Sequence, residues 1–331
     1  MKASQLITSI KALCQKKVPT FLWGAPGIGK SSIIKQIAQK QKIGFIDLRL
    51  ALMDPTDLKG IPFYDKDSHT ALWAPPAFLP TCGEGILFLD ELNSAPPSVQ
   101  ASAYQLILDR KVGEYELPDG WAIVAAGNRE SDRGVVYRMP SPLANRFVHF
   151  EMEVDVDDWK SYAYKMEIDE RIISYISYKN EHLFTFDPKS DLKSFATPRS
   201  WDFVDSILKS SLDKELLLDS ISGSVGRDVG VSFLTFTKVM DKLPDIMGIL
   251  NTGEGEYRDE LDVLHALSTG LVSALLKEKS EDNLDNLLQY TLGLKSEFAV
   301  LIVQDLQRNG ITMEHSKVFK KWVEKFSYLL A

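Results

Sequence analysis

The chain has 331 residues, of which 44% are hydrophobic and 25% charged. This balance is typical of a globular protein that buries a sizeable core, and the length suits two or three domains, so disordered and fibrous classes are excluded. The formal net charge of −8 argues against a broad electropositive surface for duplex DNA, although a local basic pore can lie inside an acidic protein.

Targeting and redox signals point to a cytoplasmic protein. No apolar run approaches the roughly 18 residues of a membrane helix, and residues 1–5 lead into an amphipathic pattern rather than a signal-peptide core. The only cysteines, Cys14 and Cys82, form neither a CxxC pair nor a disulfide framework. We therefore expect a reducing compartment, no membrane association and no structural zinc.

Apolar spacing predicts alternating helices and strands over the first 153 residues. Residues 3–15 and 31–41 carry apolar side chains at three- and four-residue intervals, which is the pattern of an amphipathic helix. Short β-rich or continuously apolar runs predict strands at 18–23, 44–50, 86–89, 121–126 and 148–152. Strands that alternate with helices indicate an α/β domain of three layers, with a parallel sheet in the middle.

The pattern becomes mostly helical after about residue 153. Asp187-Pro188 and Thr197-Pro198 break it into segments, and a turn is expected near residues 251–255. We therefore predict three parts: an α/β core at 1–153, a helical domain at 154–245 and a helical extension at 246–331.

The segment Gly24–Ser31 predicts a phosphate site. It reads Gly-Ala-Pro-Gly-Ile-Gly-Lys-Ser and matches GxxxxGK[ST] between a predicted strand and a predicted helix. Glycines let backbone N–H groups curl around phosphate oxygens, and the helix N-terminus adds a favourable dipole. Lys30 is expected to reach the β- and γ-phosphates of ATP, and the Ser31 hydroxyl to bind Mg²⁺. The predicted nucleotide contacts are Gly24, Ala25, Pro26, Gly27, Ile28, Gly29, Lys30, Ser31 and Ser32. The alternative is a glycine-rich turn that happens to precede a lysine.

Two acidic residues follow the apolar strand at 86–89. A strand that ends in Asp90-Glu91 places Asp90 at the carboxyl edge of the sheet, beside the phosphate loop, where it can hold the Mg²⁺ shell. Glu91 is then positioned to polarise the attacking water. Without the phosphate loop before it, a strand that ends in two acidic residues would be a weak signal, because such residues are more often solvated turn residues than catalysts.

Together these residues resemble the AAA+ ATPases, and more narrowly the MoxR family of the helix-2-insert clade. The narrower resemblance rests on residues 54–60, Asp-Pro-Thr-Asp-Leu-Lys-Gly, and on residues 90–100, which are similar to the family's DEINRAPPKTQ. Leu117-Pro118 and Ala125–Asn128 follow at the expected distances, and the resemblance covers residues 18 to about 205. The family usually has Arg where this chain has Ser94, so a contact made by that arginine is not carried over.

The resemblance implies three further site residues. Asn128 corresponds to the polar sensor that hydrogen-bonds the attacking water or the γ-phosphate, the alternative being a turn-forming Gly-Asn. Arg146 corresponds to the arginine finger that reaches a neighbouring subunit's γ-phosphate, with a surface salt bridge as the alternative. Arg133 and Arg138 are rivals for that role. Arg199 corresponds to the second sensor, acting in cis or in trans, and here the alternative is simply a capped helix.

The family architecture is an AAA+ core with the parallel sheet, an all-helical lid and, here, a helical C-terminal extension. Two hairpins are expected, one within Asp57–Pro80 that would face the pore or substrate and one within Lys111–Pro118. For both, ordinary core and edge packing is the alternative. The five histidines are scattered, so no metal beyond nucleotide Mg²⁺ is expected.

The implied activity is Mg²⁺-dependent ATP hydrolysis by a homo-oligomer, a hexameric ring by resemblance. The first hypothesis for its role is chaperone-like remodelling of a protein partner, which in the family often carries a von Willebrand factor A domain. The second is a nucleic-acid motor of restriction or helicase type. Residues 246–331 hold 13 acidic and 9 basic side chains, which argues against a DNA clamp there. A third hypothesis is a nucleotide-gated switch with weak turnover. Glu91 argues against it, because a switch does not need a catalytic base.

Overall fold

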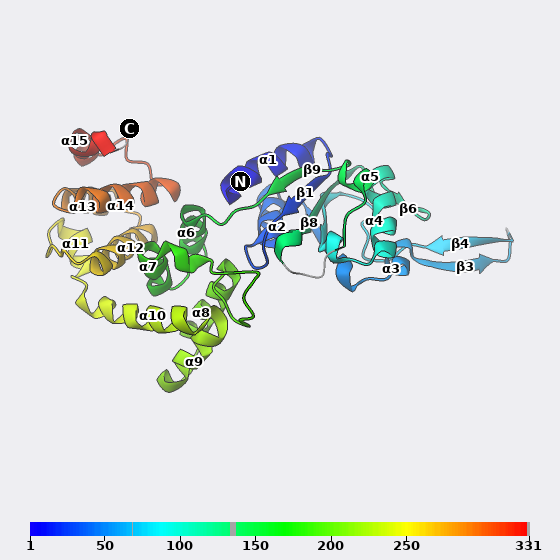
Figure 1. The fold of residues 1–331 in the computed structure, drawn as a ribbon. Helices are drawn as coiled ribbons and strands as arrows, with labels where there is room; N and C mark the ends of the chain where they lie inside the picture. Colours follow the sequence, from blue (N-terminus) through cyan, green and yellow to red (C-terminus); the bar gives the residue numbers. More distant parts are fainter. Residues whose placement is uncertain (68, 133–136, 330–331) are drawn as a thin grey trace. The chain divides into compact units, whose positions relative to one another are not determined.

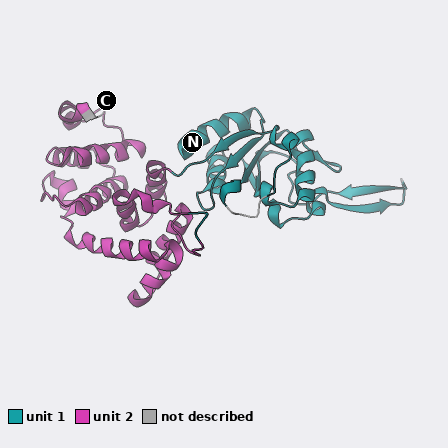
Figure 2. Ribbon diagram, in the orientation of Figure 1, with its two compact units in different colours: residues 1–154, 187–190 teal, residues 155–186, 191–331 magenta. Residues whose placement is uncertain are grey.

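The computed structural model describes residues 1–67, 69–132 and 137–329 (Figure 1). The chain divides into two compact units (Figure 2). Unit 1 comprises residues 1–154 and 187–190, and unit 2 comprises residues 155–186 and 191–331. The boundary predicted between residues 245 and 246 falls inside unit 2, and a separate extension there stays a prediction.

A five-stranded parallel sheet forms the centre of unit 1. Its strands are β1 (Thr20–Trp23), β2 (Gly44–Arg49), β5 (Glu84–Asp90), β8 (Gly120–Gly127) and β9 (Val148–Glu151). Their order across the sheet is β2-β5-β8-β1-β9. The five strands predicted from the sequence are therefore the five strands of this sheet. β1 begins at Thr20 rather than Val18, which is consistent with Pro19 having no N–H to donate to a ladder.

Alternate side chains of the sheet face two helical layers. Phe21, Leu87 and Ile123 share one buried cluster with the apolar face of α4. The residues between them point to the other face, where α1 and α2 bury their own apolar stripes. The three-layer α/β fold is thus confirmed. The helices of unit 1 are α1 (Ala3–Gln15), α2 (Lys30–Gln41), α3 (Pro55–Lys59), α4 (Pro97–Asp109) and α5 (Ser141–Ala144), with 3-10 turns η1 (Leu50–Leu52), η2 (Leu92–Ser94) and η3 (Glu130–Asp132).

Two antiparallel hairpins lie outside the central sheet and differ in packing. The first pairs β3 (Ile61–Asp65) with β4 (Thr70–Ala74) and extends from unit 1 as a two-stranded ribbon (Figure 1). Ile61 is 71% exposed and Tyr64 is 63% exposed, so this ribbon carries apolar surface in contact with solvent. Its start requires Gly60, because a Cβ there would lie 2.0 Å from the Ala74 carbonyl oxygen.

The second hairpin pairs β6 (Lys111–Val112) with β7 (Tyr115–Glu116). Val112 and Tyr115 are buried in the cluster around α4, and the Tyr115 hydroxyl donates to the Pro80 carbonyl oxygen at 2.6 Å. For this hairpin the core-packing alternative describes the structure.

Unit 2 is helical. Its elements are α6 (Val156–Lys165), α7 (Glu170–Tyr178), η4 (Asn180–Leu183), α8 (Pro198–Lys209), α9 (Lys214–Val225), α10 (Arg227–Thr237), η5 (Lys238–Lys242), α11 (Ile246–Thr252), α12 (Leu261–Lys277), α13 (Glu281–Thr291), α14 (Ser296–Arg308), α15 (Lys317–Phe326) and η6 (Ser327–Leu329). Trp201 and Tyr175 are fully buried and lie 5.7 Å apart between ring centroids. In the described part of the chain, no helix is both long enough and apolar enough to cross a bilayer.

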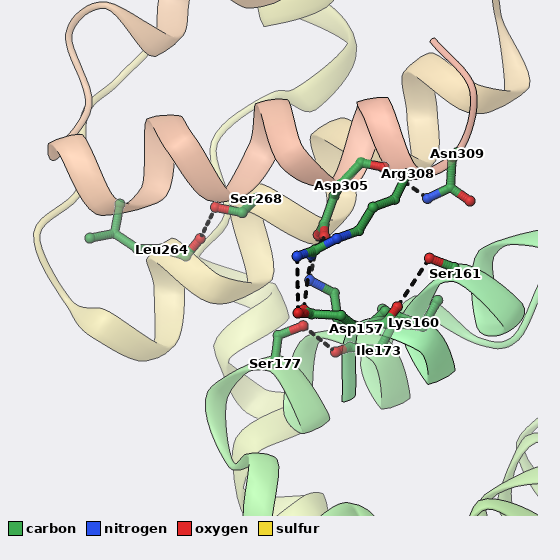
Figure 3. Close-up of polar contacts among 10 residues, drawn as sticks. All are labelled: Asp157, Lys160, Ser161, Ile173, Ser177, Leu264, Ser268, Asp305, Arg308 and Asn309. Carbon is green, nitrogen blue, oxygen red and sulfur yellow. Dashed lines mark hydrogen bonds and ion pairs between the residues drawn. The ribbon is translucent and has the colours of Figure 1, made fainter. Parts of the chain in front are cut away.

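Ion pairs join the first helix of unit 2 to a helix near its end (Figure 3). Lys160 on α6 pairs with Asp305 on α14, and each side chain is 4% exposed. Arg308 on α14 pairs with Asp157 on α6 at 2.9 Å. These contacts show that α14 packs directly on the start of the helical unit.

Candidate functional site

The loop between β1 and α2 has the backbone of an anion site. Gly27 and Gly29 both have positive φ, at 76° and 97°. Nothing lies within 4 Å of a Cβ built at Gly29, so its left-handed backbone rather than lack of space favours glycine there. Gly29 is also the N-cap of α2, so the first N–H groups and the positive end of a 12-residue helix face the loop. A phosphate group fits these donors.

Lys30 is held on this loop and on the neighbouring strand. Its Nζ donates to the carbonyl oxygens of Gly24 at 2.6 Å and Ala25 at 3.0 Å. It also donates to Asn128 Oδ1 at 3.0 Å. These acceptors are neutral, so a charged phosphate oxygen would form stronger hydrogen bonds with the same ammonium group. The structure therefore brings Lys30 and Asn128 into direct contact, although 98 residues separate them.

Asp90 and Glu91 lie at the carboxyl end of β5, on the same edge of the sheet. Glu91 has φ 56° and ψ 33°, a left-handed conformation that costs a non-glycine residue about 1–3 kcal/mol. Its N–H donates to Asp90 Oδ1 at 2.9 Å, and its carbonyl oxygen accepts from Ser94 N at 2.9 Å. Both side chains are half-buried. Other described non-glycine residues share this conformation, among them the helix C-caps Lys42 and Arg110, so it is the place of Glu91 at this edge that makes it a candidate.

Sheet order sets the spacing between these groups. β8 lies between β5 and β1, and Asn128 directly follows β8. Neighbouring strands are about 4.8 Å apart, so the ends of β5 and β1 are separated by about 10 Å, with Asn128 between them.

A third carboxylate adds to the negative charge of this edge. Partial burial, and then the charge of Asp90, raise the pKa of Asp47 on β2, and Glu91 acts in the same direction. The positive charges of Arg49 and Lys35 oppose this shift. Asp47 was not predicted from the sequence, because one acidic residue inside a strand carries no motif.

Asn93 also received no role from the sequence, although it lies in the segment that resembles the family. It is buried, and its Nδ2 donates to the Asn128 carbonyl oxygen at 2.7 Å. The only sequence signal is a polar amide two residues after Glu91.

The structure does not bring Arg146 to this edge. Arg146 is exposed and precedes β9, whose first residue, Val148, pairs with Thr20 at the start of β1. The phosphate loop follows Trp23 at the other end of β1. A four-residue strand spans about 13 Å, so Arg146 lies at the opposite end of the strands from the loop.

The remaining arginines are placed as follows. Arg199 is exposed at the second position of α8 in unit 2, where Thr197 accepts from Ser200 N at 3.1 Å as the helix cap. The capped-helix part of the prediction is therefore present, and the sensor role stays a prediction. Arg138 is exposed. Arg133 lies outside the described residues.

The donor set fits a nucleoside triphosphate with Mg²⁺. The loop N–H groups, Lys30 and the Ser31 hydroxyl are donors for phosphate, and Asp90 supplies a carboxylate oxygen at the same edge. Mg²⁺ bound with nucleotide usually takes only one or two protein oxygens, the rest being water and phosphate. The expectation that Ser31 and Asp90 form such a pair stays a prediction.

Comparison with known proteins gives the following similarities. Residues 20–149 match the profile of the family described as "ATPase family associated with various cellular activities (AAA)". Over 145 residues, 41% of this chain, the sequence is 29% identical to midasin from Giardia intestinalis. The matched part spans only 3% of that protein's length.

Solved structures give weak overall similarity. A protein described as a "putative ATPase" from Cytophaga hutchinsonii aligns with a TM-score of 0.39 and 13% identity, over 97% of this chain and 89% of the other. A point mutant of RuvB from Thermotoga maritima aligns with a TM-score of 0.36 and 17% identity, over 97% and 85% of the two chains.

Proposed function

We propose that the AAA ATPase domain at residues 20–149 hydrolyses ATP with the help of Mg²⁺, in the cytoplasm. The observation that carries the proposal is the convergence of Lys30, Asn128 and the strained Glu91 turn on one edge of the sheet. Bound Mg²⁺ would neutralise charge on the phosphates, and Ser31 and Asp90 would hold it.

Each residue then has a separate task. The loop N–H groups and Lys30 bind and orient the phosphates. On binding, Lys30 Nζ would exchange its neutral oxygen acceptors for charged phosphate oxygens, which accept stronger hydrogen bonds. Glu91 orients a water and takes its proton, and the Asn128 side chain fixes the same water or the γ-phosphate by a hydrogen bond. Arg199 would complete the site from the lid, in cis or in trans. Binding and hydrolysis are therefore separable by mutation.

The test compares three full-length variants. Lys30→Ala should weaken ATP binding about 10- to 100-fold, because a hydrogen-bonded charge contributes roughly 1.5–3 kcal/mol. Glu91→Gln should keep binding and lower kcat by about 10²- to 10⁴-fold, as expected for loss of a general base. Lys40→Ala, an exposed lysine of the same helix, is the matched control and should behave as wild type. Wild-type turnover in Glu91→Gln would contradict the assignment.

For the biological role, we propose remodelling of a protein partner by a MoxR-like homo-oligomer, a hexameric ring. The β3–β4 hairpin supports a protein partner, because Ile61, Phe63 and Tyr64 are exposed on one short ribbon. Within it, Lys66 is outnumbered by Asp65 and Asp67, so the ribbon has no excess positive charge for phosphate binding. By resemblance, a von Willebrand factor A domain protein is the first partner to examine.

A trap experiment separates this role from a nucleic-acid motor. Glu91→Gln with Mg-ATP would be recovered from its native lysate, with Lys30→Ala as the empty control. The proposal expects a protein that is enriched only in the trap and is lost when Phe63→Ser is added. Nucleic acid in its place, with a steep salt dependence, would favour the motor.

A further inference from the structure

Asn93 is a buried amide that joins two parts of the candidate site. The side chain is 2% exposed and belongs to η2, the turn directly after Glu91. Its Nδ2 donates to the Asn128 carbonyl oxygen at 2.7 Å. Its own backbone carbonyl accepts from Tyr137 N at 2.7 Å. The amide orientation is fixed chemically, because the reversed amide would direct an oxygen at the Asn128 carbonyl.

The other end of the amide lies against the last residue of β8. A Cβ at Gly127 would be 2.2 Å from Asn93 Oδ1, so glycine at this position makes room for the Asn93 side chain. Among the described residues, no donor reaches Asn93 Oδ1. A half-satisfied buried amide is costly, which makes pure packing a poor reason for an asparagine here.

The contacts of Asn93 continue to the phosphate loop. The carbonyl oxygen of Gly127 accepts from Gly24 N at 3.3 Å, and Asn128 Oδ1 accepts from Lys30 Nζ at 3.0 Å. In the other direction, Glu91 is the N-cap of η2, and its carbonyl oxygen accepts from Ser94 N. Asn93 is therefore the side-chain contact between the turn that carries Glu91 and the strand end that carries Asn128.

We propose that Asn93 is a positioning residue for hydrolysis. It fixes the distance between Glu91, the base, and Asn128, the sensor, so that both side chains can hydrogen-bond the same attacking water. The proposal rests on the ATPase function proposed above. Among the described residues, the Asn93 side chain donates to the Asn128 carbonyl oxygen and not to the phosphate loop or Lys30. Its loss should therefore change the alignment of the reacting groups and leave nucleotide binding to the loop and Lys30.

The first test is Asn93→Ala in the full-length protein. Because a misplacement of about 1 Å can cost 10²-fold in rate, kcat should fall about 10- to 100-fold, while the Kd of fluorescent ADP changes by less than about threefold. Gln100→Ala is the matched control, since Gln100 is an equally buried amide that donates to the Ala95 carbonyl oxygen at 3.0 Å. It should lower Tm and leave kcat per folded molecule unchanged.

If Asn93→Ala folds poorly, Gly127→Ala alone tests the same contact, because it keeps Asn93 and displaces its amide. Where both variants fold, a double-mutant cycle adds a second test. Gly127→Ala adds a methyl group where the Asn93 amide lies and should lower kcat in the wild-type background. In the Asn93→Ala background the added loss should shrink at least about threefold, because the amide is gone. The new methyl group would also lie 2.8 Å from Phe21 Cζ. Because Phe21 is present in both backgrounds, the effect of this contact on kcat cancels in the comparison.

The outcomes separate the two proposals. Absence of ATP turnover in the wild-type protein would refute the ATPase function. Wild-type turnover together with an unchanged kcat in Asn93→Ala, or a loss no larger than in Gln100→Ala, would refute the positioning role alone. Additive effects of the two substitutions in the cycle would refute it as well.

Discussion

At the scale of single residues, the Lys160–Asp305 pair of unit 2 shows how charge is held inside an apolar core. Burial raises the pKa of Asp305 more than the adjacent Lys160 lowers it. Arg308 also contacts Asp305, at 3.4 Å, and it extends the pair to Asp157 on α6. A pair of this kind contributes little net stability compared with apolar residues, but breaking it leaves one charge buried alone.

We therefore expect Lys160→Met to lower the free energy of unfolding by about 3–5 kcal/mol, because Asp305 would stay buried without its main cation. Lys277→Met removes an exposed pair with Glu170 in the same unit and should cost less than about 1 kcal/mol. Urea unfolding checks both values. Adding Asp305→Leu to Lys160→Met should recover part of the loss, and equal costs for the two single variants would show that the buried pair does not hold α14 on α6.

At the scale of secondary-structure elements, α12 carries a histidine that links stability to pH. His265 packs edge-on against Phe298 at 5.0 Å and lies 5.8 Å from the Tyr178 ring. Burial, and then the positive charge of Lys160, lower the pKa of His265 to about 4. Asp305 on α14 is the nearby acidic partner of Lys160. His265 is therefore neutral in the folded state at pH values where the unfolded chain already binds a proton.

The sign of the pH effect follows from that difference. Since the unfolded state binds more protons between pH about 6.5 and about 4, the His265 contribution to stability is present above this window and is lost as pH falls through it. His265→Phe should lose less stability than wild type on acidification, so its urea midpoint should rise relative to wild type toward pH 4. His315→Phe, at an exposed histidine, is the control. Parallel pH curves for wild type and His265→Phe would contradict the argument.

Local patterns predicted the elements of unit 1 well, because each strand is its own apolar run. Ile86–Leu89 is apolar without interruption, and it forms the buried middle of β5, with neighbours on both sides. The order of the strands was not predicted, because it depends on pairings such as Leu22 with Ala126 that no local pattern records. For the hairpin that carries Tyr115 the sequence left core packing and an exposed surface as alternatives, since an aromatic residue in a hairpin suits both, and the structure has the first.

The candidate site divides in the same way. The phosphate loop and the Asp90-Glu91 pair are contiguous motifs, so the residues that form them could be identified from the sequence. Asn93 is hydrogen-bonded to a residue 35 positions away, and the pKa of Asp47 responds to the charge of Asp90 on another strand, relations that no local pattern records. The positive φ of Glu91 is likewise a result of the turn after β5 and not of the residue type.

At the scale of the whole molecule, the position of Arg146 bears on assembly. It precedes β9, at the opposite end of the parallel strands from the phosphate loop. An arginine placed there cannot contact phosphate in its own loop, so a finger role requires a second copy of the chain. This agrees with the proposed homo-oligomer, in which each site would be completed by its neighbour.

Mixing two inactive variants tests this arrangement. Arg146→Ala keeps its phosphate loop but lacks the finger, and it should lose about 10³-fold or more of kcat. Lys30→Ala keeps the finger but lacks nucleotide binding. In mixed assemblies, an Arg146→Ala site beside a Lys30→Ala neighbour receives an intact arginine, so steady-state ATPase assays of the mixture should recover activity that neither variant has alone. Arg138→Ala, at an exposed arginine eight residues earlier, should remain active alone. If the two variants co-purify through different tags and the mixture stays inactive, Arg146 does not act between subunits. If Arg138→Ala shows the complementation instead, the finger is Arg138.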